Sequence, residues 1–167
     1  MHGQKQLPSA TDATGRTRSA TADPIDYDLI ELLFFAYRDF TSDPDDILEG
    51  IGFGRAHHRV VHFVDRQPGL TVADLLETLK ITKQSLARVL KQLVDGGYIR
   101  QVAGPEDRRQ RKLFTTDRGR NLARALAEPQ SRRIARAMEA AGPGNRAAIE
   151  AFLRGMVNSN IRGNGVS

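Results

Sequence analysis

Cysteine and tryptophan are both absent from this chain of 167 residues. The lack of cysteine excludes disulfide bonds, thiolate redox sensing and zinc sites with cysteine ligands. No apolar run approaches the roughly 20 residues that a membrane-spanning helix needs. The first 24 residues also lack the apolar segment of a secretory signal. These absences predict a cytoplasmic protein that makes no contact with a membrane.

Acidic residues dominate one segment only. Between residues 23 and 49 every charged residue except Arg38 is acidic, although the whole chain has a net charge of +5 and an isoelectric point near 10.0. The basic excess therefore lies downstream, and it favours an anionic partner such as nucleic acid. Residues 1–23 are polar, and we expect a disordered leader there. Residues 24–167 are long enough for a single domain with a modest core.

An amphipathic helix is predicted from Thr82 to Asp95. Thr82 is a suitable N-cap, and Gly96 with Gly97 favours the left-handed conformation that often follows a helix. The apolar residues recur at helical spacing and form one stripe: Leu86, Val89, Leu90, Leu93 and Val94. The other face is polar and mostly basic: Lys83, Gln84, Ser85, Arg88, Lys91 and Gln92.

This polar face has two interpretations. It is either an ordinary solvated helix surface or a surface that contacts DNA. Lysine and arginine neutralise phosphates and also bond guanine edges, while glutamine pairs bidentately with adenine. The flanking sequence decides between the two interpretations.

A short helix is predicted just before this one, from Thr71 to Leu79, with Val72, Leu75, Leu76 and Leu79 on its buried side. The connection through Lys80 and Ile81 is short enough for the turn of a helix-turn-helix. After the glycines, residues 98–102 and 112–115 are predicted to form two strands. The loop between them carries Arg108, Arg109 and Arg111. A basic hairpin beside a basic helix predicts a winged helix-turn-helix that binds double-stranded DNA.

The region from residue 50 to 127 resembles the MarR family of bacterial transcriptional regulators. The resemblance rests on the helix from Thr82, the Gly-Gly stop, the wing segment PEDRRQRK and the following TTDRG. The wing pattern of the family, an acidic residue, any residue and an arginine, matches 107–109, and its Thr-x-x-Gly helix start matches 116–119. Thr115 departs from the family, which more often has leucine there.

The resemblance implies a mainly α fold with a small β-hairpin wing, in which N- and C-terminal helices form a homodimer. Residues 24–49 and 117–167 would then be mainly dimerisation helices, and residues 50–116 would form the winged helix-turn-helix lobe. Two-fold symmetric readers bind two-fold symmetric sites, so we expect a pseudo-palindromic operator. The DNA-binding residues implied by the helix and the wing are Thr82, Lys83, Gln84, Ser85, Arg88, Lys91, Gln92, Asp107, Arg108, Arg109 and Arg111.

The family also implies a repressor, associated with the nucleoid, that responds to a small-molecule effector. Effectors in this family lodge between the dimerisation helices and the DNA-binding lobe, which makes Phe34, Tyr37, His58 and His62 candidates for the lining. His58 and His62 are four residues apart and share a helical face, a spacing that can also ligate zinc. The sequence shows no third and fourth ligand, so we expect no metal site. A metal-sensing regulator remains the alternative to a regulator that responds to a small molecule.

Two other classes compete with a sequence-specific regulator. A non-specific architectural protein would use its lysines and arginines on phosphates alone, whereas Gln84 and Ser85 at the helix start favour reading of bases. An enzyme would need a motif such as GxGxxG, a phosphate loop or a nucleophile elbow, and the sequence has none of these. We therefore expect neither an enzymatic activity nor a cofactor.

Overall fold

The computed structural model describes residues 25–104 and 110–158, and the structural statements below refer to these residues. They form a helical protein with one antiparallel hairpin, which confirms the predicted fold class. The elements in chain order are α1 (Tyr27–Ser42), α2 (Asp45–Glu49), α3 (Arg55–Arg66), α4 (Val72–Leu79), α5 (Lys83–Asp95), β1 (Ile99–Ala103), β2 (Arg111–Thr115), α6 (Asp117–Ala141) and α7 (Arg146–Met156). The expected leader and the wing tip at 105–109 lie outside the described residues.

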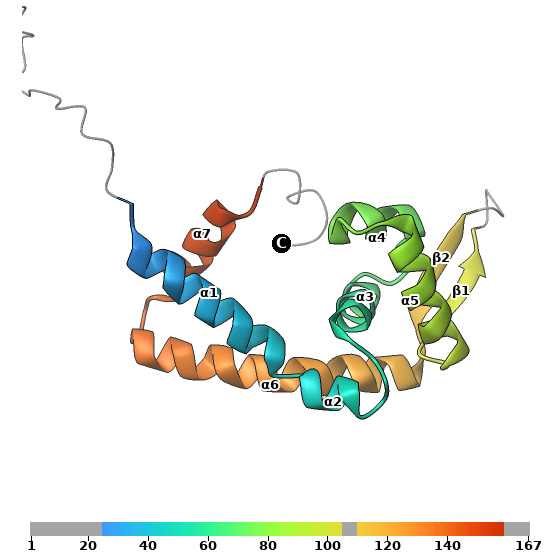
Figure 1. The fold of residues 1–167 in the computed structure, drawn as a ribbon, viewed down its shortest axis with the longest axis horizontal. Coiled ribbons are helices and arrows are strands. Elements are labelled where there is room, and N and C mark those ends of the chain that lie inside the picture. Colours follow the sequence, from blue (N-terminus) through green and yellow to red (C-terminus); the bar gives the residue numbers. More distant parts are fainter. Residues whose placement is uncertain (1–24, 105–109, 159–167) are drawn as a thin grey trace, which may run out of the picture.

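Two groups of elements lie at opposite ends of the long helix α6 (Figure 1). One group, which we call the DNA lobe, comprises α3, α4, α5 and the hairpin β1–β2. The other comprises α1 and α7. The hydrophobic core lies in the DNA lobe and includes side chains from every element of that lobe together with Leu122 and Leu126 of α6. Burial of this core fixes α3, α5 and the hairpin against the first turns of α6.

The helix-turn-helix begins and ends where the sequence predicts. Thr71 forms a capping box with Asp74, in which each side chain accepts a hydrogen bond from the other residue's backbone N–H, at 3.2 and 2.8 Å. Lys80 ends α4 in the left-handed conformation, with a φ of 50°. The Thr82 hydroxyl accepts a hydrogen bond from the Ser85 N–H at 3.1 Å and starts α5. These caps make the turn between the two helices short and defined.

Before α4 the sequence predicts one helix over residues 50–66, with Ile51, Val60, Val61, Phe63 and Val64 available for burial, and the structure differs from this prediction. A five-residue helix, α2, comes earlier, and α3 begins only at Arg55. Between them Gly52 has a φ of 71°, which interrupts any helix, and the Phe53 N–H donates to the Leu48 carbonyl at 2.8 Å. Ile51, expected to be buried, is therefore on this loop and 38% exposed.

Pro129 lacks a backbone donor, so the sequence predicts a kink or an interruption of the helix that starts at Thr116. The structure shows no interruption, because α6 runs from Asp117 to Ala141. Two contacts to the α1 region directly follow the proline. The Gln130 side chain donates to the Phe40 carbonyl at 3.0 Å, and Arg133 forms a bidentate ion pair with Asp43. These contacts fix the part of α6 that directly follows the proline to the end of α1.

Helices α1 and α7 bury no residue fully. Instead they expose large apolar side chains: Tyr27, Leu29, Ile30, Leu32, Phe34, Phe35, Tyr37 and Phe40 on α1, and Phe152, Leu153 and Met156 on α7. An exposed apolar surface of this size marks an interaction site. Within the described residues, no helix has the length and apolar character needed to cross a membrane.

Candidate nucleic-acid interface

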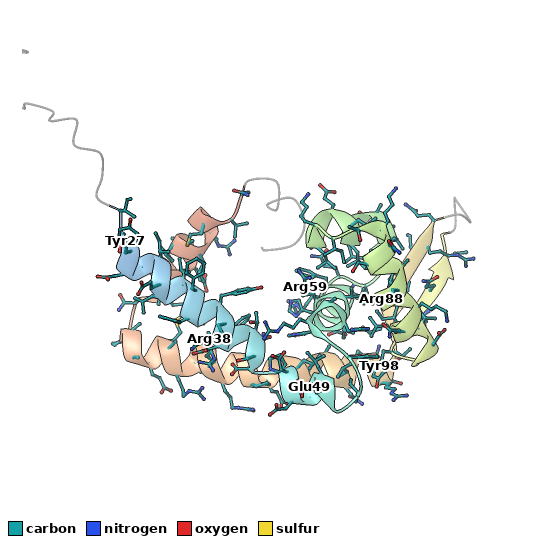
Figure 2. All side chains as sticks on the ribbon, in the orientation of Figure 1. Tyr27, Arg38, Glu49, Arg59, Arg88 and Tyr98 are labelled. Carbon is teal, nitrogen blue, oxygen red and sulfur yellow. The ribbon has the colours of Figure 1, made fainter. Side chains whose placement is uncertain are left out.

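Helix α5 divides into a buried face and an exposed face. Leu86, Val89, Leu90 and Leu93 are all less than 5% exposed, as predicted, and only Val94 is half-buried. At about 100° per residue, Gln84, Arg88 and Lys91 lie near the centre of the opposite face, and all of these are exposed. Figure 2 shows Arg88 on α5 at the surface of the DNA lobe. The structure thus brings three of the expected DNA-binding residues onto one outward surface.

The remaining polar residues of α5 lie on its two flanks. Lys83 lines a groove of about 380 Å³ together with Val72 of α4 and Gln101 of β1, so it belongs to the flank near the hairpin. Ser85 and Gln92 lie on the opposite flank, where the Gln92 side chain meets His57 of α3 at 2.8 Å. Thr82 lies at the helix start, and its hydroxyl is engaged in the N-cap.

Lys91 is paired within its own helix. Its ammonium group donates to the Asp95 carboxylate, one turn further along α5, and both side chains are well exposed. Exposed pairs of this kind contribute little to stability. The ammonium group can therefore exchange Asp95 for a phosphate at low cost.

The hairpin presents further basic side chains beside α5. Its register pairs Ile99 with Thr115 and Ala103 with Arg111. Arg100 on β1 lies over the ring of Phe114, with 4.7 Å between the guanidinium carbon and the ring centroid. Arg111 is exposed at the start of β2. The other expected wing residues, Asp107, Arg108 and Arg109, lie outside the described residues.

The TTDRG segment joins the hairpin, α5 and α6. The Thr116 hydroxyl accepts from the Gly119 N–H at 3.1 Å and donates to the Gly97 carbonyl at 2.6 Å. Arg118 donates to the Gly96 carbonyl at 3.0 Å and lies over the ring of Tyr98 at 4.4 Å. Arg118 therefore caps the C-terminal end of α5. Sequence reasoning missed this role, although the arginine stands inside the motif that carried the resemblance.

Thr115, the departure from the family pattern, has a partner. It is 7% exposed, and its hydroxyl donates to the Asp65 carboxylate on α3 at 2.9 Å. A buried hydroxyl needs such a partner, because leaving it unpaired is costly. The pair links the hairpin to α3, where a leucine would only pack.

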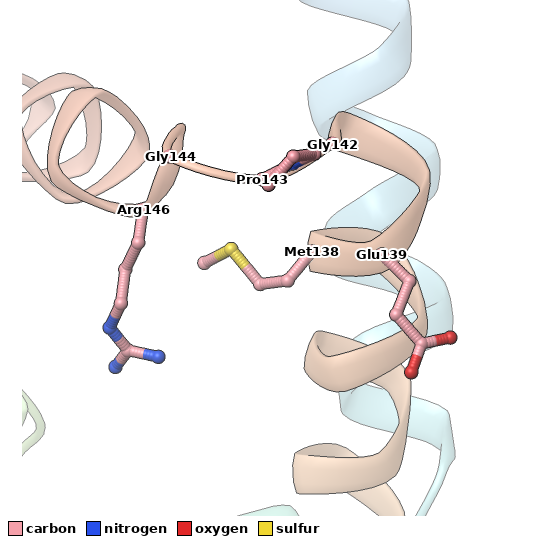
Figure 3. A pocket seen from close by; sticks show the side chains of 6 residues that line it. All are labelled: Met138, Glu139, Gly142, Pro143, Gly144 and Arg146. Atoms are coloured by element: carbon pink, nitrogen blue, oxygen red, sulfur yellow. The ribbon is translucent and has the colours of Figure 1, made fainter.

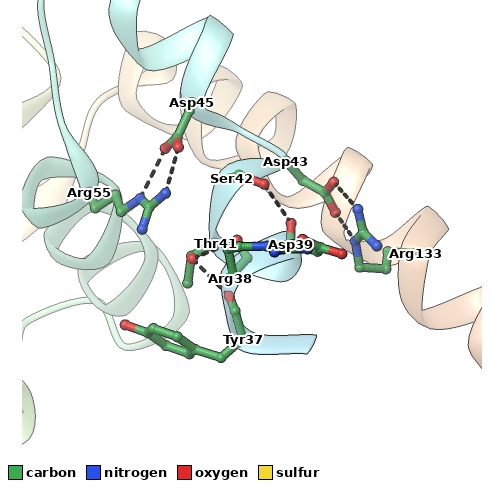
Figure 4. A network of polar contacts seen from close by, with 9 residues as sticks. All are labelled: Tyr37, Arg38, Asp39, Thr41, Ser42, Asp43, Asp45, Arg55 and Arg133. Atoms are coloured by element: carbon green, nitrogen blue, oxygen red, sulfur yellow. Dashed lines mark hydrogen bonds and ion pairs between the residues drawn. The ribbon is translucent and has the colours of Figure 1, made fainter. Parts of the chain in front are cut away.

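Two bidentate ion pairs hold the segment between α1 and α2, one to α3 of the DNA lobe and one to α6 (Figure 4). Asp45 of α2 accepts from Arg55 of α3 at 2.7 and 3.2 Å, and Asp43 accepts from Arg133 of α6 at 2.7 Å through both oxygens. The hydrogen bonds from the two arginines lower the pKa of Asp43 and of Asp45. The segment between α1 and α2 is thereby fixed to both α3 and α6.

The expected ligand-pocket residues lie on two helices. Phe34 and Tyr37 of α1 are each 68% exposed, while on α3 His58 is half-buried and His62 is at the surface. The two imidazole rings face each other edge-on, with centroids 6.5 Å apart. Burial lowers the pKa of His58, and the charge of His62 adds to this effect, against a smaller opposing effect of Asp45. Within residues 25–104 and 110–158, no three potential ligands among His, Asp and Glu are grouped to hold a metal ion.

A surface hollow of about 470 Å³ lies elsewhere, at the turn from α6 to α7 (Figure 3). Met138 and Glu139 from the end of α6, the turn residues 142–144 and Arg146 line it. It is remote from His58 and His62 and includes none of the expected pocket residues. The structure therefore does not bring Phe34, Tyr37 and the histidines together around this hollow.

Known proteins share both the sequence and the fold. A family model described as MarR family matches residues 51–110. The HTH-type transcriptional regulator PetP of Rhodobacter capsulatus is 47% identical over 133 residues, which cover 80% of this chain and 80% of PetP. FabT of Streptococcus pneumoniae, solved in complex with DNA, superposes with a TM-score of 0.68 at 20% identity, over 78% of this chain and 94% of FabT.

A second solved structure, the transcriptional repressor CouR bound to a 23-mer DNA duplex, has a TM-score of 0.64 at 23% identity, over 81% of this chain and 94% of CouR. These solved structures show that the fold is shared. The identity to PetP extends well beyond the helix-turn-helix and carries the assignment. This chain belongs to the MarR family of helix-turn-helix transcriptional regulators.

Proposed function

We propose that this protein is a homodimeric repressor that binds a pseudo-palindromic operator in double-stranded DNA and releases it when a small-molecule effector binds. One observation carries the DNA-binding part. Gln84, Arg88 and Lys91 project from one exposed face of α5, whose opposite face is buried. A helix presented in this way fits the major groove of B-form DNA.

The positions of the side chains suggest different tasks. Gln84 and Arg88 would face base edges, because they lie in the first two turns at the centre of the exposed face. Lys83, Ser85 and Lys91 would contact phosphates, with Thr82 holding the helix start in register. In the wing, Arg109 would enter the minor groove and Asp107 would hold it by a charge-assisted hydrogen bond. Arg108 and Arg111 would contact the flanking backbone.

Dimer formation follows from the exposed apolar helices. Covering an apolar side chain such as Phe34 or Leu153 contributes roughly 1.5–3 kcal/mol, and α1 and α7 expose many of them. We infer that residues 24–49 and 117–167 mainly form the dimer interface and that residues 50–116 form the lobe that binds DNA. A two-fold dimer places its two α5 helices on two half-sites.

Control by an effector would act between these two parts. Tyr37 projects from α1 toward the side of α3 that carries Arg55 (Figure 4). Phe34 follows on α1 one turn earlier, and His58 and His62 lie on α3. A ligand held between the helices would change the position of the DNA lobe relative to α1. To cause release, the ligand must bind the DNA-free conformation of the protein more tightly than it binds the DNA-bound conformation.

The direct test is to recover the genomic duplexes that the purified protein enriches and to measure binding to point variants of the best site. Gln84→Ala and Arg88→Ala should each cost about 1–3 kcal/mol and relax the preference at one position of each half-site. Arg132→Ala, which removes an exposed arginine far from α5, is the matched control. It should change neither the DNA affinity nor the base preference at any operator position.

The competing function is an architectural protein that binds DNA without sequence preference. In that case Gln84→Ala and Arg88→Ala would weaken every duplex equally, and an excess of random DNA would abolish binding. A preference that survives random competitor contradicts this alternative.

A further inference from the structure

A histidine of α3 is hydrogen-bonded to a glutamine of α5 across 35 positions of the sequence: His57 Nε2 lies 2.8 Å from Gln92 Oε1. The other ring nitrogen, Nδ1, accepts the backbone N–H of Gly54 at 3.1 Å. Nδ1 therefore carries no proton in the neutral ring, and the proton resides on Nε2. His57 donates to Gln92, and the carbonyl oxygen of the Gln92 side chain is the acceptor.

The imidazole ring is held firmly in this orientation. It stacks on the Phe53 ring with the centroids 4.4 Å apart and the planes nearly parallel. Phe53 packs edge-on against Tyr98 at 5.2 Å, and Tyr98 is only 6% exposed under the guanidinium of Arg118. His57 is thus supported by the same residues that end α5. Its position cannot change without disturbing this stack.

Gln92 itself is exposed, on the flank of α5 that faces α3. With Oε1 accepting from His57, the amide NH₂ is the end left for a ligand, and within the described residues it has no partner. The amide oxygen has two lone pairs, and His57 occupies one of them. The bond thereby fixes the plane of the amide and leaves its NH₂ group as a hydrogen-bond donor that faces away from His57.

We propose that His57 is a positioning residue that fixes the Gln92 side chain as a donor to a DNA phosphate oxygen. The inference rests on the proposed function, because it requires α5 to dock on DNA. From the sequence, Gln92 is expected only to be a DNA-binding residue, and the proposal assigns it a phosphate contact. A contact on the helix flank, one turn beyond Arg88, is suited to the sugar–phosphate strand that borders the groove.

The test is a double-mutant cycle with His57→Phe and Gln92→Ala, measured on the best genomic duplex and on a random-sequence duplex of equal length. Phenylalanine keeps the stack on Phe53 but cannot donate. Gln92→Ala should weaken binding to both duplexes about five- to tenfold, since a phosphate contact carries no sequence information. His57→Phe should weaken binding less than Gln92→Ala does, and it should have no further effect once Gln92 is alanine.

A second variant separates positioning from structure. Gln92→Lys can donate to a phosphate without help from His57, so His57→Phe should have no effect on DNA affinity in that background. If His57→Phe lowers the DNA affinity equally in the parent, in Gln92→Ala and in Gln92→Lys, His57 has only a structural role and the proposal is wrong. Thermal unfolding of each variant without DNA reports that structural contribution separately.

Chemical substitution of the DNA decides which group Gln92 contacts. Replacing single phosphates by methylphosphonates should reveal one position in each half-site whose effect disappears in Gln92→Ala and shrinks in His57→Phe. If the loss depends on 7-deaza-adenine or 7-deaza-guanine and not on any phosphate, Gln92 reads a base and the inference fails. The random duplex separates failure of the proposed function from failure of this inference. If the protein binds both duplexes equally, the proposal of a specific operator is wrong, yet the coupling between His57 and Gln92 can still be measured.

Discussion

Gly119 lies against the backbone carbonyl of Tyr98 with no room for a side chain between them. A Cβ added at Gly119 would overlap the Tyr98 carbonyl oxygen and would lie 3.0 Å from its carbon and 3.3 Å from the Thr115 Cβ. Two of these atoms belong to the backbone, which cannot move aside as a flexible side chain can. This approach lets the first turn of α6 pack directly on Tyr98, in the segment that joins α5 to β1, and it explains the glycine of the Thr-x-x-Gly motif.

The first prediction follows from this contact. Gly119→Ala should lower the free energy of unfolding by about 1–3 kcal/mol, as overpacking does, and should weaken DNA binding because α5 ends at the same place. Urea unfolding at one fixed protein concentration measures the loss. Gly54→Ala is the matched control: nothing lies within 4 Å of its added Cβ, its φ of -131° suits alanine, and it lies outside the helices proposed to form the dimer. An equal loss in both variants would contradict the steric explanation.

The second prediction concerns the link between hairpin and α3. Thr115→Val keeps the shape of the side chain but removes the hydroxyl that donates to Asp65. We expect a loss of about 1–2 kcal/mol in the free energy of unfolding. In the background of Asp65→Ala the same substitution should cost clearly less, because its partner is already gone. Additive losses in the double variant would show that the two side chains do not interact.

The third prediction is the pH dependence of the Asp43–Arg133 pair. Arg133 lowers the pKa of Asp43 in the folded protein, so the folded state binds this proton less readily than the unfolded chain. The stabilisation is complete above the ordinary aspartate pKa of about 3.9 and is lost as the pH falls through the lower, folded value. Asp43→Asn should therefore lower stability at pH 7 by roughly 1 kcal/mol.

The difference between the parent and Asp43→Asn should shrink as the pH falls from 5 to 3. Asp39→Asn is the control, because the Arg38–Asp39 pair is exposed and local, and it should change stability little at any pH. A difference that stays constant down to pH 3 would show that the Asp43 charge is not what stabilises the pair.

The fourth prediction concerns His58. Its pKa is lowered in the folded protein, chiefly by burial, so the unfolded chain takes up the proton first as the pH falls. Stability should therefore decrease as the pH drops through about 6.5. The fall in Tm between pH 7.5 and 5.5 should be smaller in His58→Gln than in the parent. The pKa of His62 is lowered as well, again chiefly by burial, so His62→Gln should also reduce the slope. A slope that neither substitution changes would contradict the prediction.

The fifth prediction tests the dimer. Phe34→Asp on α1 and Leu153→Asp on α7 place a charge on the exposed apolar surfaces and should shift the protein toward monomer at micromolar concentration. Light scattering measures the mass. Ile51→Asp, on the loop before α3, is a control that should leave the mass unchanged. A parent protein that is monomeric at this concentration would disprove the two-fold operator model.

The sequence predicted α4, α5 and the hairpin because their signals are local. Thr71 and Thr82 are caps that act within three residues, and the apolar stripe of α5 repeats within one helix. The five-residue helix α2 is too short to show a period, and Gly52 acts as a break that only its φ reveals. Local signals of this kind also located the candidate DNA surface at Gln84, Arg88 and Lys91.

The remaining features depend on contacts between distant parts of the chain. Gln130 and Arg133, which follow Pro129 in the unbroken α6, contact Phe40 and Asp43 at the end of α1, 90 positions away. The bond from His57 to Gln92 joins two helices whose sequences carry no sign of each other. Such pairs become visible only once the fold has brought them together, which is why the role of Gln92 could not be assigned from its residue type.

The continuity of α6 has a geometric consequence. One unbroken helix of 25 residues carries the DNA lobe at its start and the apolar helices α1 and α7 toward its end. Each residue of a helix adds about 1.5 Å and turns the chain by about 100°. A single residue inserted between Arg124 and Pro129 would therefore rotate the surface of α5 by about a quarter turn around the axis of α6, while a seven-residue insertion would nearly restore its direction and displace it by about 10 Å. The number of residues in α6 thus sets both the direction in which the exposed face of α5 points and its distance from α1 and α7.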